Sequence, residues 1–290
     1  MTSSAQLLWT KPDWLETATG WIDLNLHQHG IKRTGPLEQH HIRPWSTVIK
    51  VSSTTGPLFF KAVVPNLAHE AVLTQTLARW LPDQSPPVLA ADSDRGWLLM
   101  SDSGRRLRES LRSETDIQHW LKLLPAYAEL QIELAHHLDG LLGLGVPDRR
   151  LPRLPVFFKA LLTNSPILAL GRPDGLSSTD HRRLRGYFSY LNRLCDRLAD
   201  YGVPPSLDHG DFHDGNIFVQ GDRYLLLDWG DSSVTHPFFS LRSTFVSLEN
   251  TFGLAENSPW FPKLRDSYLE PWTAFETRDH RPILGIGGIG

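Results

Sequence analysis

Apolar residues recur at regular spacing through the first hundred residues and predict a helix, a group of strands and a second helix. Trp14, Ala18, Trp21 and Ile22 lie three or four positions apart, as on the buried face of an amphipathic helix that ends at Gly30. Short runs of branched and aromatic residues follow, separated by turn residues, which is typical of an antiparallel meander. The predicted elements are a helix over 12–26, strands over 37–43, 48–51 and 57–64, a helix over 67–81 and a strand over 97–100.

The rest of the chain has mainly helical periodicity, interrupted by one hairpin. The predicted helices cover 116–142, 154–162 and 178–201. The last of them is expected to begin with Ser178 as its N-cap. Two apolar strands, 216–220 and 223–227, flank Gly221-Asp222, a pair of residues that suits a tight turn. Strands therefore dominate the first part of the chain and helices the second, with the change near residue 102.

Length and composition indicate a globular chain with two compact parts. The 290 residues suit two domains, which we place at 1–102 and 103–290. With 29 basic and 32 acidic residues the net charge is −3, which disfavours nucleic acid and anionic membranes as partners. No apolar run is long enough to span a bilayer, the N-terminus lacks the pattern of a signal peptide, and Cys195 is the single cysteine. These features predict a cytoplasmic protein.

The clearest chemical pattern surrounds the predicted hairpin. Residues 209–216 read H-G-D-F-H-D-G-N, and the second hairpin strand is followed by Asp228. Two carboxylates, Asp211 and Asp228, and the carboxamide of Asn216 are therefore expected to converge at one end of the hairpin. Phosphoryl transfer needs oxygen ligands for a divalent cation and a carboxylate that orients and deprotonates the attacking hydroxyl. The spacing H-x-D-x-x-x-x-N, then a strand and another Asp, matches the kinase catalytic loop and its metal-binding Asp.

The order H-G-D-x-H-x-x-N followed by D-W resembles the aminoglycoside phosphotransferase and choline kinase-like superfamily, whose members are relatives of protein kinases. The resemblance implies an α+β, two-lobed protein-kinase-like fold. Its small N-terminal lobe has an antiparallel sheet and one main helix, and its larger C-terminal lobe is mostly helical. It further implies that Asp211 is the catalytic residue, that Asn216 and Asp228 hold Mg²⁺, and that ATP is the phosphoryl donor.

A kinase-like fold also requires a lysine on an N-terminal strand, held by a helix glutamate, to bind the nucleotide phosphates. Lys61 lies within the apolar strand 57–64, and Glu70 falls one turn into the next helix, where family members carry the lysine's partner. A lysine in such a strand is costly to bury without a counter-charge. The alternative is a Lys61 on an edge strand that points to solvent, with Glu70 on a wet helix face.

The remaining nucleotide contacts leave weaker traces in the sequence. The strand 97–100 and the residues after it fall where the family has its inter-lobe hinge, so Met100 or Ser101 would meet adenine through the main chain. The predicted turn 43–47 lacks the glycines that let backbone N–H groups approach phosphate, and Ser46 is its best candidate contact. The G-x-G-x-x-G at 285–290 ends the chain without a following helix, so we do not read it as a dinucleotide site.

Two histidines and one missing carboxylate complete the pattern. In the resembling family the first His supports the catalytic loop by hydrogen bonding, so His209 is given a structural role, while His213 stays unassigned. Family members commonly carry a further Asp after D-W, which the stretch 235–240 lacks, and this questions the local support of the loop. Fewer residues follow Asp228 than is usual in the family, so the acceptor side is expected to be cut short or minimal.

The leading hypothesis is an ATP-dependent, Mg²⁺-requiring kinase that phosphorylates a hydroxyl of a small polar acceptor, such as an aminoglycoside, an amino sugar or a choline-like alcohol. One alternative is a kinase-like nucleotide-binding protein without turnover, favoured by the glycine-poor turn. Another is a metal-dependent hydrolase that uses H-x-D-x-H-D at 209–214 as ligands. The acceptor, the preference for ATP over GTP and the oligomeric state, monomer or homodimer, stay open.

Overall fold

The computed structural model describes residues 7–275, and they divide into two compact units. Unit 1 comprises residues 7–112, 143–146 and 209–232, and unit 2 comprises residues 113–142, 147–208 and 233–275. Unit 1 holds most of the strands and unit 2 most of the helices, which confirms the predicted α+β class. The lobe boundary at residue 102 stays a prediction, because the first unit also takes in segments from beyond it.

Unit 1 is built on a five-stranded sheet of order β1-β2-β3-β5-β4, antiparallel throughout. A second, three-stranded sheet of order β6-β8-β9 contains the predicted hairpin. The elements of unit 1 are α1 (Pro12–Gln28), β1 (Arg33–Ile42), β2 (Ser46–Ser53), β3 (Gly56–Val63), α2 (His69–Trp80), β4 (Val88–Asp92), β5 (Trp97–Ser101), β6 (Arg105–Arg106), β8 (Ile217–Gln220) and β9 (Arg223–Leu226). The predicted meander, both helices and the hairpin are confirmed, while β4 was not predicted.

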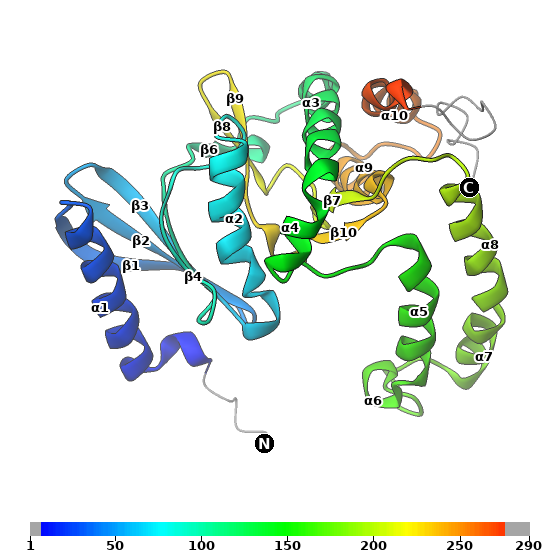
Figure 1. Ribbon diagram of the computed structural model, residues 1–290, viewed down its shortest axis with the longest axis horizontal. Coiled ribbons are helices and arrows are strands. Elements are labelled where there is room, and N and C mark those ends of the chain that lie inside the picture. Colours follow the sequence, from blue (N-terminus) through cyan, green and yellow to red (C-terminus); the bar gives the residue numbers. More distant parts are fainter. Residues whose placement is uncertain (1–6, 276–290) are drawn as a thin grey trace. The chain divides into compact units, whose positions relative to one another are not determined.

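Side-chain alternation along the central strands gives the large sheet two different faces. Phe60 pairs in register with Leu99, and both pack with Ala18 and Ile22 of α1 in one apolar core. Figure 1 shows α1 lying along this sheet. The next residue along β3, Lys61, points to the opposite face, which is where α2 contacts the sheet. The strand period therefore directs the lysine away from the α1 core and toward the helix that carries Glu70.

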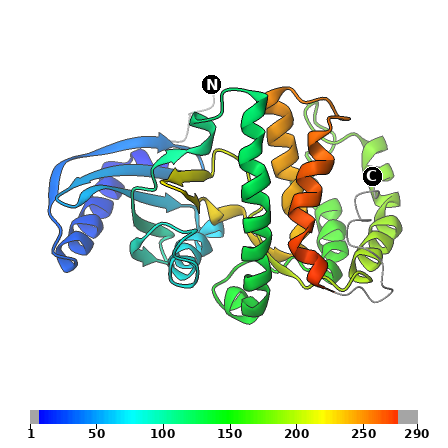
Figure 2. The same ribbon diagram turned by 90° about the horizontal axis from the view of Figure 1, so that it is seen from above.

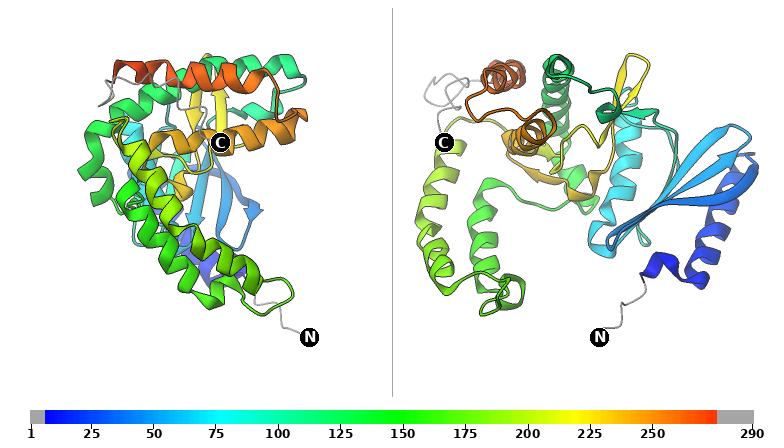
Figure 3. Two further views of the ribbon diagram at one scale, coloured as in Figure 1. Left: turned by 90° about the vertical axis from the view of Figure 1, so that its right-hand side faces the viewer. Right: turned by 180° about the vertical axis from the view of Figure 1, so that it is seen from behind.

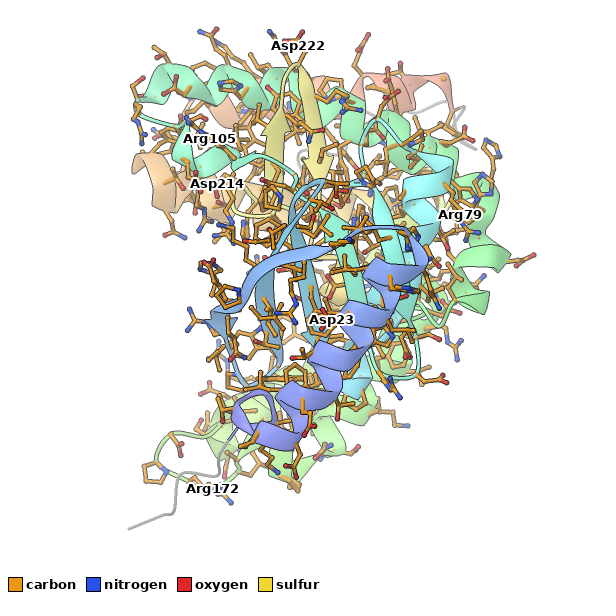
Figure 4. All side chains as sticks on the ribbon, turned by 90° about the vertical axis from the view of Figure 1, so that its left-hand side faces the viewer. Asp23, Arg79, Arg105, Arg172, Asp214 and Asp222 are labelled. Carbon is orange, nitrogen blue, oxygen red and sulfur yellow. The ribbon has the colours of Figure 1, made fainter. Side chains whose placement is uncertain are left out.

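The hairpin β8–β9 has the turn expected from its sequence. Gln220 pairs with Arg223, and Gly221 adopts a left-handed conformation with φ of 62° between them. Asp222 marks the exposed tip of this hairpin in Figure 4. At its base, the Leu226 amide donates to the Gln84 carbonyl and the Leu227 amide donates to the Asn216 carbonyl. These bonds fix the residues that flank the hairpin on both sides.

Within the part of the chain that the structure describes, unit 2 contains eight α-helices, several short 3₁₀ helices and a two-stranded antiparallel ladder. Its longest helix, α3, packs against α10 and runs beside α9 and α10 in Figure 2, and α5 lies beside α8 in Figure 3. The elements are α3 (Gln118–Leu134), α4 (Leu138–Gly143), α5 (Leu154–Thr163), α6 (Ser165–Leu168), α7 (Ser178–Gly186), α8 (Phe188–Ala199), β7 (Ser206–Asp208), β10 (Ser233–Thr235), α9 (Ser240–Phe252) and α10 (Trp260–Leu269).

Two predicted helices of unit 2 differ from the structure in detail. The helix expected over 116–142 is interrupted by a 3₁₀ turn, Ala135–His137, and the helix expected over 178–201 is divided at Tyr187. The N-cap is Ser177 rather than Ser178, because the Ser177 hydroxyl accepts a hydrogen bond from the Asp180 amide. The glycine-rich stretch 285–290 lies outside the described residues. No helix within residues 7–275 is both long enough and apolar enough to cross a membrane.

The stretch 235–240, which lacks the further Asp of the resembling family, contributes to a buried polar cluster in unit 2. Ser240 occupies the end of the stretch 235–240, and its hydroxyl donates to the carboxylate of Asp208, directly before His209. Gln131 donates to the Leu207 carbonyl and accepts a 2.6 Å bond from the Tyr268 hydroxyl. Asp208, the residue that leads into the loop 209–216, is therefore held by the Ser240 hydroxyl.

Candidate active site

Lys61 makes two short ion pairs in unit 1. Its Nζ lies 2.5 Å from Oε1 of Glu70 and 2.7 Å from Oδ1 of Asp228. The Lys61 and Glu70 side chains are only 9% and 3% exposed, so water does not satisfy these charges. β3 is a central strand flanked by β2 and β5, and the alternative of an edge-strand Lys61 that points to solvent is therefore wrong. The two ion pairs of Lys61 therefore connect β3 with α2, which carries Glu70, and with Asp228, which follows the hairpin β8–β9.

The electrostatics of this triad keep the lysine charged. Burial acts to lower the pKa of Lys61, but attraction to Glu70 and Asp228 outweighs it and the pKa is raised. For Asp228, burial acts to raise the pKa, and the nearby Lys61 ammonium holds it below its usual value. Burial raises the pKa of Glu70, whose Oε2 is buried without a hydrogen-bond partner. The site therefore presents an ammonium group next to an ionised Asp228.

Asp211 and Asn216 are joined within the loop 209–216. The Asn216 amide nitrogen Nδ2 lies 3.0 Å from the Asp211 carbonyl oxygen and 3.2 Å from Asp211 Oδ2. This leaves the Asn216 oxygen Oδ1 without a hydrogen bond from any residue in 7–275. The bond from the Leu227 amide to the Asn216 carbonyl, 3.0 Å long, places this loop beside Asp228. Asp228 itself has a φ of 68°, in the left-handed region that few residues other than glycine adopt.

His209 supports the loop from inside the protein. Its Nε2 donates to the Leu227 carbonyl over 2.9 Å, and its ring lies 4.5 Å from that of Trp229. Burial lowers the pKa of His209, so the ring is neutral near pH 7. Gly210 follows with a φ of 78°, and a Cβ there would overlap the carbonyl oxygen of Asp231. The first two residues of H-G-D therefore serve the fold of the loop, in agreement with the supporting role that the resemblance implies for His209.

His213, which the sequence left without a role, contacts Asp211 directly. Its Nε2 lies 3.2 Å from Asp211 Oδ2, and its Nδ1 accepts a 2.9 Å hydrogen bond from the Gly215 amide. The hydrogen bond to Asp211 raises the pKa of His213, and the same bond holds the pKa of Asp211 below its usual value. The Arg108 guanidinium donates to the Asp214 carboxylate over 3.0 Å, and the same nitrogen lies 3.4 Å from His213 Nδ1. In the sequence, only the short spacing between Asp211 and His213 indicated that these two side chains could meet.

A pocket of about 390 Å³ opens beside these residues in unit 1. Ser46, Lys61, Met100, Ser101, Asn216 and Asp228, all predicted as site residues, line it. Glu70 lies behind Lys61, and Asp211 joins the pocket through its contact with Asn216. The sequence did not predict the apolar wall or the basic groups of the pocket. These residues are Val48, Phe59, Phe218 and Leu227, and His40, His41 and Arg106.

Strand alternation explains the apolar wall. Phe59, which pairs with Met100 in the sheet, and Val48, which pairs with Lys61, lie on the same face as the lysine, so they line the pocket beside it. The positions of His40 and His41 in the pocket were harder to predict, because the register of β1 shifts between Gln39 and His41 and interrupts the simple alternation of its side chains. Burial, together with the positive charges of Arg43 and Arg106, lowers the pKa of His41. Lys61 and Arg106 are therefore the fixed positive charges of the pocket.

The oxygen atoms of Asn216 and Asp228 fit a hard divalent cation such as Mg²⁺. Carboxylate and carboxamide oxygens are the ligands this ion prefers, and the Asn216 Oδ1 is free of other hydrogen bonds from the described residues. The hydrolase alternative requires a cluster of histidine and carboxylate ligands instead. Within residues 7–275 no three His, Cys, Asp or Glu side chains are grouped to hold a metal, and His209 is bonded to Leu227. The geometry does not assemble the cluster that a hydrolase would need.

Comparison with known proteins agrees with this arrangement. Residues 164–282 match the family described as Phosphotransferase enzyme family. No curated protein matches the chain at a significant level. A putative aminoglycoside phosphotransferase from Ralstonia eutropha JMP134 has a similar structure, with a TM-score of 0.60 at 16% identity over 91% of this chain and 81% of that one.

Two further structures show the same likeness. A macrolide 2'-phosphotransferase from Brachybacterium faecium has a TM-score of 0.59 at 17% identity, covering 86% of this chain and 82% of its own. A choline/ethanolamine kinase family protein from Mesorhizobium loti has a TM-score of 0.56 at 20% identity, covering 88% of this chain and 76% of its own. At such low identity these structures establish a common fold. The family match and the shared fold together confirm the resemblance of this chain to the aminoglycoside phosphotransferase and choline kinase-like superfamily.

Proposed function

We propose that this protein is an ATP-dependent phosphotransferase that transfers the γ-phosphoryl group to a hydroxyl of a small polar molecule. The observation that carries the proposal is the double ion pair of Lys61 with Glu70 and Asp228 at the pocket that Asn216 also lines. Phosphoryl transfer depends chiefly on positioning and on stabilising charge at the phosphate oxygens. A fixed ammonium beside two oxygen ligands and a catalytic carboxylate meets this requirement.

In this mechanism Asp211 accepts the proton of the acceptor hydroxyl. The hydroxyl oxygen forms a bond to the γ-phosphorus, the bond from that phosphorus to the β,γ-bridging oxygen breaks, and ADP leaves. Lys61 binds phosphate oxygens and is held in place by Glu70. Asn216 and Asp228 would hold Mg²⁺, which when bound neutralises charge on the phosphates. The exposed side of Asp211, whose side chain is 45% exposed, is where the acceptor would approach.

The adenine ring would lie against the apolar wall formed by Val48, Phe59 and Leu227. Met100 and Ser101, the two residues expected beside adenine, line the same pocket. The Ser101 amide already donates to the Pro87 carbonyl over 2.9 Å, so Ser101 would not offer its N–H to the base. We therefore expect the adenine edge to meet other main-chain groups of this segment.

The phosphate tail would meet side chains where other kinases offer a glycine-rich loop. Ser46 and Arg106 line the pocket that contains Lys61. Arg106 also lies over the Phe218 ring at 5.7 Å, a contact that holds its guanidinium in place. We propose that these two residues assist Lys61 in binding phosphate. A serine hydroxyl and a guanidinium supply hydrogen-bond donors to phosphate oxygens that a glycine-poor turn does not offer.

The acceptor is proposed to be an aminoglycoside, an amino sugar, a choline-like alcohol or a related small molecule. The net charge of −3 gives no reason to expect a nucleic-acid substrate. The single cysteine, Cys195, is compatible with the cytoplasm, where such a kinase would find ATP. These finer assignments rest on the sequence and on the family resemblance.

A screen of ADP release across these acceptor classes tests the proposal, with Mg²⁺ and ATP present and Asp211→Asn as the control. We expect at least one acceptor to stimulate ADP release by the wild type and none to stimulate the control variant. Mg²⁺-dependent ATP binding without transfer to any acceptor would instead favour a nucleotide-binding protein without turnover. The glycine-poor turn 43–47 is the feature that supports this alternative. Absence of ATP binding would exclude both kinase-like functions.

A further inference from the structure

His213 has both of its ring nitrogens engaged, and in different directions. Nδ1 accepts the 2.9 Å hydrogen bond from the Gly215 amide and so carries no proton in the neutral ring. The proton of the neutral imidazole therefore resides on Nε2, which lies 3.2 Å from Asp211 Oδ2. The Gly215 amide thus selects the tautomer in which His213 donates to the carboxylate of Asp211.

The two side-chain donors that reach Asp211 converge on a single carboxylate oxygen. Oδ2 of Asp211 is 3.2 Å from the His213 Nε2 and 3.2 Å from the Asn216 Nδ2. The second oxygen, Oδ1, receives no hydrogen bond from the residues that the structure describes, and the side chain is 45% exposed. One oxygen of the carboxylate is therefore occupied by the protein, and the other is left to a ligand.

Neighbouring residues hold His213 in this position. Its side chain is 24% exposed, and the Asp214 carboxylate beside it is 4% exposed and paired with Arg108. The Arg108 guanidinium and the His213 ring lie closely against Gly215, and a Cβ there would come within 3 Å of both and displace them. The imidazole is consequently packed in one orientation rather than free to turn.

Building on the proposed function, we propose that His213 is a positioning residue that fixes Oδ2 of Asp211, so that Oδ1 faces the acceptor hydroxyl and takes its proton. Rotation of a carboxylate by a small angle moves the accepting oxygen away from the reacting hydroxyl, and misplacement of about 1 Å can cost about 10²-fold in rate. His213 does not touch the acceptor in this scheme. Its loss should therefore lower kcat and leave the binding of ATP unchanged.

Two substitutions separate the two hydrogen bonds of His213. In His213→Asn the side-chain oxygen can take the place of Nδ1 and keep the Gly215 bond, while the donor to Asp211 is lost. In His213→Gln the amide nitrogen can reach the place of Nε2 and keep the donor, while the Gly215 bond is lost. We expect kcat to fall about 10- to 100-fold in His213→Asn and by no more than about threefold in His213→Gln, with the KM for ATP within about twofold in both.

The reverse order of kcat, or equal losses accompanied by a lower Tm, would show that His213 only supports the loop and would overturn the proposal. A wild type that phosphorylates an acceptor while both variants keep full kcat would overturn this inference and leave the proposed function intact. The ring tautomer tests the inference without turnover. Histidine ¹⁵N spectra should place the neutral His213 proton on Nε2, and a proton on Nδ1 would overturn the proposal even for a protein with no acceptor activity.

Discussion

At the scale of single residues, the buried charge of Lys61 is the strongest constraint in the site. Glu70 and Asp228 surround its Nζ, and the Glu70 side chain is 3% exposed. Removing one member of a buried ion pair leaves the other desolvated and uncompensated, which is strongly destabilising. The same residue is therefore important for folding and for the proposed binding of phosphate, and a test must separate these two effects.

We predict that Lys61→Met lowers the free energy of unfolding by about 3 to 5 kcal/mol, because it leaves the Glu70 carboxylate buried without a counter-charge. Urea denaturation measures the loss. The double variant Lys61→Met/Glu70→Gln removes both charges and should recover most of the stability without recovering phosphoryl transfer. Equal stability of the single and double variants would contradict a buried Glu70 whose carboxylate is balanced by Lys61.

Some residues of the site could be predicted from the sequence, and others could not. Lys61 and Glu70 were predictable because the kinase-like resemblance calls for a strand lysine and a glutamate in the next helix, and because a buried lysine needs a counter-charge. His41 and Arg106 were missed because their place in the pocket depends on the irregular register of β1 and on the pairing of a two-residue strand, β6. The contact of His213 depends on the turn around Gly215, which composition does not specify.

At the scale of elements, the loop 209–216 requires a glycine at its second position. Gly210 has a φ of 78° and lies against the carbonyl of Asp231, so a side chain would meet both backbone strain and a steric overlap. His209 is bonded to the Leu227 carbonyl at the end of β9. The loop 209–216 is thus held both by close backbone packing, of Gly210 against Asp231, and by a side-chain hydrogen bond, from His209 to Leu227.

Gly210→Ala is predicted to lower the free energy of unfolding by at least about 2 kcal/mol and to reduce activity. Gly20→Ala is the matched control, because Gly20 lies on the exposed side of α1 with no atom within 4 Å of an added Cβ. That change should raise stability by up to about 1 kcal/mol. Thermal denaturation of both variants checks the pair, and equal effects would refute the close approach of Gly210 to Asp231.

Periodicity predicted the elements of unit 1 well and the ends of the elements in unit 2 less well. The strand β4 was missed because its sequence, Val-Leu-Ala-Ala-Asp, has few β-branched residues, and its conformation comes from pairing with β5. The break between α7 and α8 at Tyr187 was missed because no proline marks it and the pattern continues through Gly186. The conformation of β4 thus depends on a tertiary contact, which a single sequence does not reveal.

At the scale of the whole molecule, His236 links folding to pH. The side chain is 2% exposed, and its ring lies 4.7 Å from the ring of Phe238. Burial lowers the pKa of His236 to about 4, and its Nε2 is buried without a hydrogen-bond partner. The unfolded chain, with an ordinary histidine pKa of about 6.5, takes up this proton first as the pH falls. Stability from this group is therefore complete above about pH 6.5 and is lost as the pH falls toward 4.

We predict that His236 alone accounts for a loss of about 2 kcal/mol in the free energy of unfolding between pH 7.5 and pH 5. The control, His236→Asn, can keep the acceptor for the Phe238 amide but does not titrate. Its stability should be lower at pH 7.5 because the ring packing is lost, and its pH dependence should be shallower than that of the wild type. Parallel pH profiles for the two proteins would contradict a neutral, buried His236.

The proposed phosphotransferase requires that Asp211 accept the proton of an acceptor hydroxyl while Lys61, Asn216 and Asp228 bind the nucleotide with its metal. The most direct test is transfer of the γ-phosphoryl group from Mg·ATP to the best acceptor of the screen, measured for the wild type and for Asp211→Asn. We predict that the variant binds Mg·ATP within about threefold of the wild-type Kd and transfers phosphate at least about 10²-fold more slowly. Transfer at the wild-type rate by Asp211→Asn would show that Asp211 does not accept the proton.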